Sequence, residues 1–180
     1  MDERPQLARM FFDYGCQYYV AGRFSAFAGL TPIVGNVVHH AIEMFLKGAL
    51  AKSMTLAEMR TKLGHQLPDI WNAFKTQADD ASLNSFDASI RTLNAFEDIR
   101  YPDKLFALGG TLQVDITKVG KAQATGSEAS APKYELCVEE IDELVAAIFK
   151  VSKINPAAFF GWIMPDAKAF MFRDNSFFRA

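Results

Sequence analysis

The stretch IVGNVVHHAIEMFLKGALAK, residues 33–52, decides the fold of this chain. Its apolar residues recur at threes and fours and form one stripe: Val34, Val38, Ile42, Phe45 and Ala49. That spacing is typical of an amphipathic helix with one buried face. Beside this stripe, His39, Glu43 and Lys47 recur at steps of four, which aligns three titratable side chains along the helix. The segment therefore predicts both a core helix and a candidate site.

The same periodicity predicts further helices at residues 7–27, 56–63, 67–78, 85–99 and 139–153. The pattern changes to alternation at residues 112–117, and residues 134–138 read as a second strand. Residues 120–133 are rich in small and polar side chains without periodicity, which predicts a mobile loop. We therefore expect a mainly α protein: an up-and-down helical bundle of four to five helices over residues 1–156, with a small β-hairpin insertion at about residues 105–138.

Local signals predict where several helices begin and end. Thr55 and Glu58 form a capping box, and Ser85 is the expected cap of the helix at residues 85–99. Pro102 disfavours helical geometry at Tyr101, so that helix should end there. Residues 157–180 form an aromatic C-terminal tail with seven large rings, which we expect to pack either on the bundle or on a second subunit.

Composition excludes several classes of protein. The 19 basic and 21 acidic residues give a net charge of −2, which predicts no general attraction to nucleic acid. No apolar run is long enough to cross a bilayer, so we expect no membrane partner. Cys16 and Cys137 lie far apart in apolar surroundings, which favours two buried thiols and a cytoplasmic location.

The candidate site residues each admit a structural and a functional interpretation. Glu43 and Lys47 form either an ordinary surface pair or the lining of an anion-binding groove. His65 follows Gly64 and precedes a helix, so it caps that turn or serves as an acid or base. His39 and Glu43 could bind a metal ion with His65, but the chain has no second pair at ligand spacing, so we predict no metal.

Arg100 and Asp103 belong to an Arg-Tyr-Pro-Asp corner at residues 100–103. Arg100 either compensates the dipole at the end of a helix or binds a phosphate group through its guanidinium. Asp103 either caps the turn or belongs to the same binding site. The chain contains no Walker-type loop, dinucleotide-binding glycine motif, nucleophile elbow or Cys-x-x-Cys pair. We therefore expect no cofactor.

Four segments in order resemble the HEPN domains, a family of small helical bundles. They are Tyr-Tyr-Val-Ala-Gly-Arg-Phe at residues 18–24, Ala-Ile-Glu-Met-Phe-Leu-Lys-Gly-Ala-Leu at 41–50, Gly-His-Gln-Leu at 64–67, and Arg-Tyr-Pro-Asp at 100–103. The resemblance implies a bundle that often forms a homodimer, in a toxin–antitoxin or defence-like setting. It also implies one of three roles: metal-independent RNase, nucleotide-binding module, or partner of a nucleotidyltransferase.

The RNase members of that family place a histidine four to six residues after an arginine, near the end of the bundle. Here Arg60 and His65 have this spacing but lie early, and no histidine follows Arg91 or Arg100. We therefore predict a non-catalytic module that binds a nucleotide or RNA phosphate through Glu43, Lys47, His65, Arg100 and Asp103. The alternatives are a metal-independent RNase using Arg60 and His65, and a dimeric protein-interaction module.

Overall fold

A computed structural model describes residues 2–31, 33–107, 113–118, 133–161 and 163–178 of the chain. In chain order the elements are α1 (Arg4–Phe27), α2 (Ile33–Leu50), α3 (Leu56–Lys62), α4 (Leu67–Ala78), η1 (Ala81–Phe86), α5 (Asp87–Ala95), η2 (Phe96–Ile99), α6 (Pro102–Ala107), β1 (Gln113–Thr117), β2 (Lys133–Cys137), α7 (Val138–Val151), α8 (Ala157–Phe160) and α9 (Pro165–Phe172). The labels η1 and η2 mark 3₁₀ helices. The predicted mainly α bundle with a small β insertion is confirmed.

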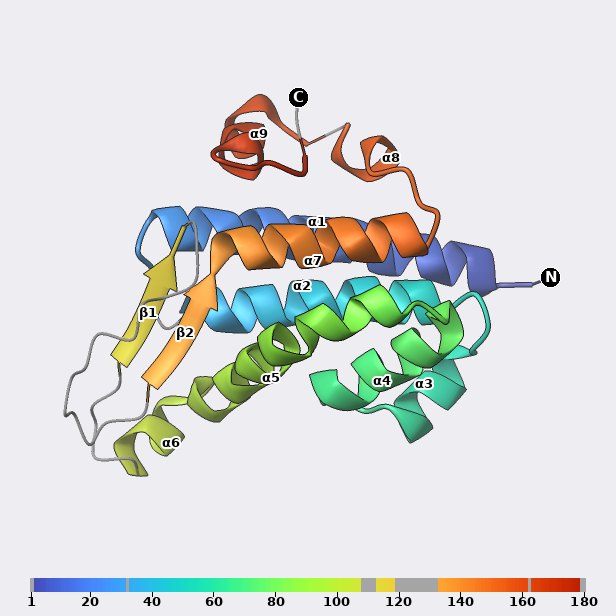
Figure 1. Ribbon diagram of the computed structural model, residues 1–180, viewed down its shortest axis with the longest axis horizontal. Helices are drawn as coiled ribbons and strands as arrows, with labels where there is room; N and C mark the ends of the chain where they lie inside the picture. The colour runs from blue at the N-terminus through green and yellow to red at the C-terminus, as the bar shows by residue number, and fades with distance from the viewer. Residues whose placement is uncertain (1, 32, 108–112, 119–132, 162, 179–180) are drawn as a thin grey trace.

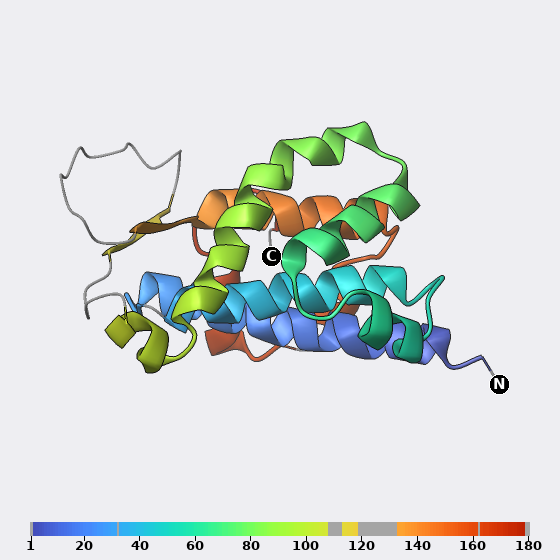
Figure 2. The same ribbon diagram turned by 90° about the horizontal axis from the view of Figure 1, so that it is seen from below.

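Three helices, α1, α2 and α7, run side by side through the middle of the molecule (Figure 1). Phe12 of α1, Phe45 of α2 and Phe149 of α7 are buried and pack on one another, with ring centroids 5.1–5.7 Å apart. Burying each such ring contributes roughly 1.5–3 kcal/mol, so this aromatic centre holds the three helices together. Figure 2 shows α3, α4 and α5 on the α2 side of this layer.

Gly35 of α2 allows η2 to approach closely. A methyl group added at Gly35 would lie 1.8 Å from Cδ1 of Phe96, a ring that is fully buried. We therefore expect Gly35→Ala to lower the free energy of unfolding by about 1–3 kcal/mol, measured by urea denaturation. If the site had room to spare, the same change would instead stabilise the helix by about 1 kcal/mol, and that result would contradict the packing described here.

The local signals between α2 and α6 are partly confirmed. The Thr55–Glu58 capping box is present: Oγ1 of Thr55 accepts a hydrogen bond from the Glu58 amide at 3.2 Å, and Glu58 accepts one from the Thr55 amide at 2.9 Å. The prediction that Ser85 caps the next helix is wrong, because residues 81–86 already form η1 and the Ser85 hydroxyl donates to the Ser82 carbonyl. Asp80 caps that turn instead, by accepting from the Ser82 amide.

The two strands are not a hairpin. β1 and β2 pair in parallel, with Gln113 opposite Lys133 and Thr117 opposite Cys137. A tight turn can join only antiparallel strands, whereas parallel pairing needs a connection of a dozen or more residues. The 15 residues between Thr117 and Lys133 meet that requirement. The predicted mobile loop falls almost entirely on residues 119–132, which lie outside the described residues, while Lys133 begins β2.

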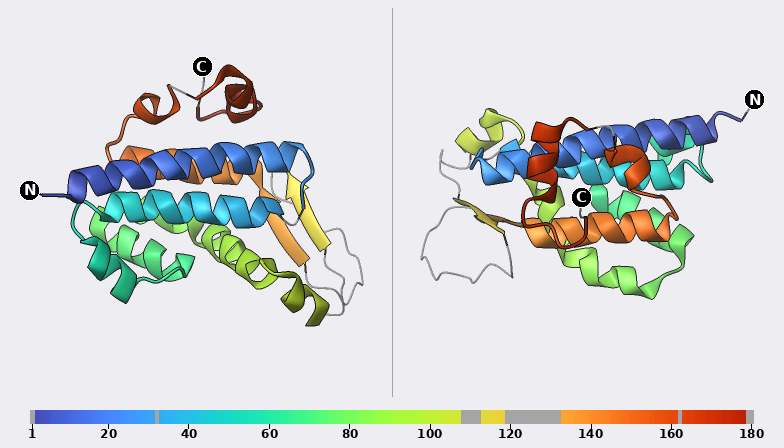
Figure 3. Two further views of the ribbon diagram at one scale, coloured as in Figure 1. Left: turned by 180° about the vertical axis from the view of Figure 1, so that it is seen from behind. Right: turned by 90° about the horizontal axis from the view of Figure 1, so that it is seen from above.

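The aromatic C-terminal tail covers α1 and α7 of its own chain (Figure 3). Phe159, Phe160 and Phe178 are buried, and their rings contact Phe12, Tyr19 and Phe149. Phe177 is 41% exposed. The rings of the tail thus complete the same aromatic centre that α1, α2 and α7 begin.

A buried polar network fastens this tail to the bundle. The Arg23 guanidinium forms an ion pair with Asp142 of α7 and donates to the backbone carbonyls of Phe170 and Arg173 in the tail. Tyr19 donates to Asp142 at 2.6 Å and accepts from Asn175 at 3.0 Å. All four side chains are at most 7% exposed. This Arg23 network, formed by Tyr19, Arg23, Asp142 and Asn175, therefore joins α1, α7 and the tail.

Candidate functional site

Glu43 is the centre of the candidate site. Its side chain is 1% exposed, and Oε1 accepts hydrogen bonds from Nζ of Lys47 at 2.6 Å and from Nδ1 of His65 at 2.8 Å. Oε2 lies 3.5 Å from Nδ1 of His40. His40, Glu43 and Lys47 share one side of α2 because they are three and four residues apart. The predicted pairing of Glu43 with Lys47 is therefore present, but it is buried and is not a surface pair.

Lys47 and Asn94 fix the turn that carries His65. The Lys47 ammonium also donates to the carbonyl of Gly64 at 2.7 Å, which ties α2 to the turn between α3 and α4. Gly64 has φ +56°, a left-handed conformation that glycine adopts without strain. Asn94 of α5 accepts from the Leu67 amide at 3.0 Å and donates to the side chain of Gln66 at 3.2 Å. His65 is thus held against Glu43 while 76% of its side chain stays exposed.

The environment of Glu43 keeps it ionised. Burial opposes its negative charge, but hydrogen bonds from His40, Lys47 and His65 and the charge of Lys47 outweigh that cost and lower its pKa from 4.5 to about 2. An ionised carboxylate accepts hydrogen bonds and donates none. At neutral pH Glu43 therefore orients the three N–H donors around it and does not act as an acid.

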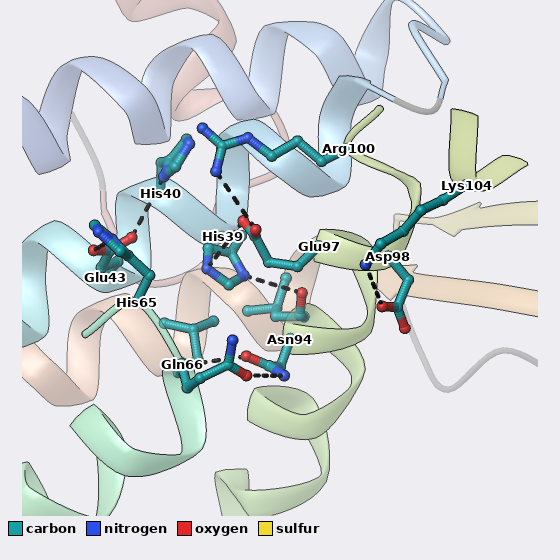
Figure 4. Close-up of polar contacts among 12 residues, drawn as sticks. His39, His40, Glu43, His65, Gln66, Asn94, Glu97, Asp98, Arg100 and Lys104 are labelled. Atoms are coloured by element: carbon teal, nitrogen blue, oxygen red, sulfur yellow. Dashed lines mark hydrogen bonds and ion pairs between the residues drawn. The ribbon is translucent and has the colours of Figure 1, made fainter. Parts of the chain in front are cut away.

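A second carboxylate, Glu97 of η2, lies beside the first group (Figure 4). Oε1 of Glu97 is 3.5 Å from Nε2 of His39, and Oε2 is 3.5 Å from Nη1 of Arg100. His39 is fully buried, and its Nδ1 lies 3.3 Å from the Leu93 carbonyl. Because a carbonyl can only accept, Nδ1 carries the proton. Burial also lowers the pKa of His39, so its ring is neutral at neutral pH.

These two groups together form what we call the histidine–carboxylate cluster: His39, His40, Glu43, Lys47, His65, Glu97 and Arg100. Its buried members are His39, Glu43 and Lys47. Its outer members are His40, with 26% of the side chain exposed, Arg100 with 38%, and His65 with 76%. In Figure 4 Arg100 reaches from the end of η2 toward the side of α2 that carries His40. A ligand would therefore meet two imidazoles and a guanidinium.

The structure brings some of the predicted site residues together and leaves others apart. Glu43, Lys47 and His65 meet at one point, whereas Arg100 pairs with Glu97, and Figure 4 shows its guanidinium near His40. Asp103 lies exposed in the first turn of α6, and Arg60 lies exposed on α3. Within the described part of the chain, the side chains of Arg60 and Asp103 form no hydrogen bond and no ion pair. Only four of the six predicted residues are thus part of the cluster.

Three members of the cluster, His39, His40 and Glu97, were not among the six predicted site residues. His40 and His39 are neighbours in sequence, so their side chains point about 100° apart, and the structure buries one and half-exposes the other. One feature of the sequence could have indicated Glu97: it lies three residues before Arg100, and this spacing allows the two side chains to pair on one helical face. Its contact with His39 joins residues 58 positions apart, and helical spacing carries no information about such a contact.

Comparisons with family models, with curated proteins and with solved structures gave no match for this chain. In the part of the chain that the structure describes, no helix is long and apolar enough to cross a membrane. Among those residues, no three His, Cys, Asp or Glu side chains are grouped so that they could hold a metal ion. The chemistry of the histidine–carboxylate cluster is therefore the basis for a functional proposal.

Proposed function

We propose that this chain binds a phosphate-bearing ligand, a nucleotide or an RNA phosphate, at the outer side of the histidine–carboxylate cluster. The observation that supports this proposal is the gathering of Arg100, His40 and His65 around two carboxylates, Glu43 and Glu97, that are themselves mostly buried. Guanidinium and imidazole N–H groups are suitable donors to phosphate oxygens. The carboxylates orient these donors from beneath.

Lys47 has a supporting role in this proposal. Both of its hydrogen bonds are directed inward, to Glu43 and to the Gly64 carbonyl, and only 10% of its side chain is exposed. Its charge balances Glu43, and its bond to Gly64 holds the His65 turn in place. Lys47 is thus a positioning residue, and Arg100 is the principal contact with the phosphate.

The charge balance of the cluster predicts modest affinity. Lys47 and Arg100 carry two positive charges, and Glu43 and Glu97 carry two negative charges. Because these charges cancel, binding depends on hydrogen bonds and on the local field of Arg100 more than on a net positive patch. We therefore expect dissociation constants in the high-micromolar to millimolar range.

Replacement of Arg100 tests this proposal. Because a charge-assisted hydrogen bond to phosphate contributes about 1–2 kcal/mol, we expect Arg100→Ala to weaken binding about tenfold. The measurement is isothermal titration calorimetry with AMP, ATP, inorganic phosphate and a short single-stranded RNA, in the presence of EDTA. Arg91→Ala, an exposed arginine on α5 outside the cluster, is the matched control and should bind as the wild type does.

Three outcomes would contradict the proposal. An absence of heat with all four ligands at millimolar concentration would remove it, as would equal affinity of the Arg100→Ala protein and the wild type. Cleavage of the RNA in EDTA that His65→Ala abolishes would replace it with the RNase alternative. Stronger binding of RNA than of AMP, with a steep dependence on salt, would identify RNA as the ligand within the proposal.

A further inference from the structure

A separate cavity of about 560 Å³ lies where the N-terminal half of α1 meets α8, which are neighbours in Figure 1. Its apolar lining consists of Pro5, Ala8, Phe12, Ile154, Ala158 and Phe159. The rings of Phe12 and Phe159 pack against each other with centroids 5.6 Å apart. Small-molecule sites have volumes of about 300–1,000 Å³ and are mostly apolar with a few polar groups. This cavity has both properties and shares no residue with the histidine–carboxylate cluster.

The polar groups of the cavity are mainly cationic. Arg4, Arg9 and Lys52 contribute to its lining, and Asp2 is the single carboxylate among the described residues that line it. Asp2 is bound by Arg4, with Nε of Arg4 2.9 Å from Oδ1. Arg9 is 75% exposed and lies 3.9 Å from Asp13, while the Lys52 ammonium donates to the backbone carbonyl of Ser152. The charges of Arg9 and Lys52 are therefore only weakly compensated in the described part of the chain.

We infer that this cavity binds an amphiphilic anion, a molecule with an apolar chain that ends in a carboxylate. The chain would lie on Pro5, Ile154 and Ala158, which are exposed or half-buried at the cavity, and each methylene group buried there contributes about 0.8 kcal/mol. The carboxylate would lie at the rim between Arg9 and Lys52. A neutral hydrocarbon would leave these cations without a partner, and a cationic amphiphile would be repelled by them. The inference is independent of the phosphate site.

Titration of the full chain with dodecanoate below its micelle concentration tests the inference. We expect saturable binding of one molecule, measured by calorimetry. Dodecyltrimethylammonium has the same chain and the opposite charge, and it should bind at least about tenfold more weakly. Acetate, which has the head group alone, should give no measurable binding. Equal affinity for the two amphiphiles, or heat that never saturates, would overturn the inference and indicate adsorption to apolar surface.

Two variants locate the site. Arg9→Glu should weaken dodecanoate binding about tenfold, because it places a like charge at the rim. Ala158→Trp should abolish binding, because Ala158 is exposed at the cavity and an indole there would fill it. Arg91→Glu, which makes the same change in charge on α5, should bind normally. Unchanged affinity in both of the first two variants, with circular dichroism showing native folds, would overturn the inference.

Discussion

Replacement of Arg23 by methionine is expected to lower the free energy of unfolding by about 3–5 kcal/mol, the largest loss that we expect from a single change in this chain. The variant keeps an unbranched side chain of similar length but leaves the carboxyl group of Asp142 buried without its cation. It also removes two hydrogen bonds to the tail, at Phe170 and Arg173. Burial raises the pKa of Asp142 although Arg23 and Tyr19 act to lower it, so the cost of desolvation exceeds what these partners compensate.

Urea denaturation measures this loss, and limited proteolysis reports whether the tail detaches first. The matched control is Arg173→Met, because Arg173 also lies over the ring of Phe27 but is 51% exposed. It should change the free energy of unfolding by at most about 1 kcal/mol. The double change Arg23→Met with Asp142→Leu should recover part of the loss, since removal of both charges relieves the unpaired carboxylate. Equal losses in Arg23→Met and Arg173→Met would contradict the structural role of the Arg23 network.

Replacement of Glu43 by glutamine is expected to have the second-largest effect on the free energy of unfolding. At pH 7 we expect it to lower the free energy of unfolding by about 3 kcal/mol, the value that corresponds to a pKa lowered from 4.5 to about 2. The amide has nearly the shape of the carboxylate but no charge. It therefore leaves the Lys47 ammonium, which is only 10% exposed, without an anionic partner.

The effect of this substitution depends on pH in a defined direction. The pKa of Glu43 is lower in the folded state, so its stabilisation is fully present above about pH 4.5 and is lost as the pH falls toward about 2. The difference between wild type and Glu43→Gln should therefore shrink over that window. Asp142 acts in the opposite direction because its pKa is raised, but it is present in both proteins and cancels in the difference.

Urea titrations of the two proteins between pH 7 and pH 3 measure this difference. Asp13→Asn is the matched control, because Asp13 forms an i,i+4 pair with Arg9 at 3.9 Å on the surface of α1. Such a pair contributes about 0.5 kcal/mol or less, so the control should show a small loss with little dependence on pH. A difference for Glu43→Gln that stays constant down to pH 3 would show that its charge is not what stabilises the cluster.

The positions of most helices could be predicted from the sequence, since a helix depends on interactions between residues three and four apart. The expected helices at residues 33–52 and 67–78 correspond to α2 and α4, and the capping box at Thr55 is formed. One error concerns local backbone geometry, and the other concerns the direction in which two separate strands pair. Residues 85–99 contain α5 and η2 where one helix was expected, and the strands are parallel where a hairpin was expected.

The candidate site could be predicted only along single helices. Glu43 and Lys47 are one turn apart, so their pairing follows from helical geometry. Nothing in that spacing indicates that Lys47 also reaches Gly64 or that Glu97 reaches His39, because these contacts cross between elements. The distribution of exposure within the cluster, with His40, His65 and Arg100 outside and Lys47 inside, likewise depends on how α2, η2 and the α3–α4 turn pack.

The amino-acid sequence by itself determined that this chain is a mainly α bundle and that Glu43 and Lys47 lie on one side of α2, because apolar periodicity fixes the buried face of each helix and residues four apart are neighbours on it. Only the tertiary structure decided that Glu43 gathers three donors, that Arg23 fastens the tail to α7, and that β1 and β2 are parallel. The physical reason is how far apart the contacting residues lie along the chain. Helical faces are set within four residues, whereas these contacts depend on distances of a few ångströms between segments that lie far apart along the chain.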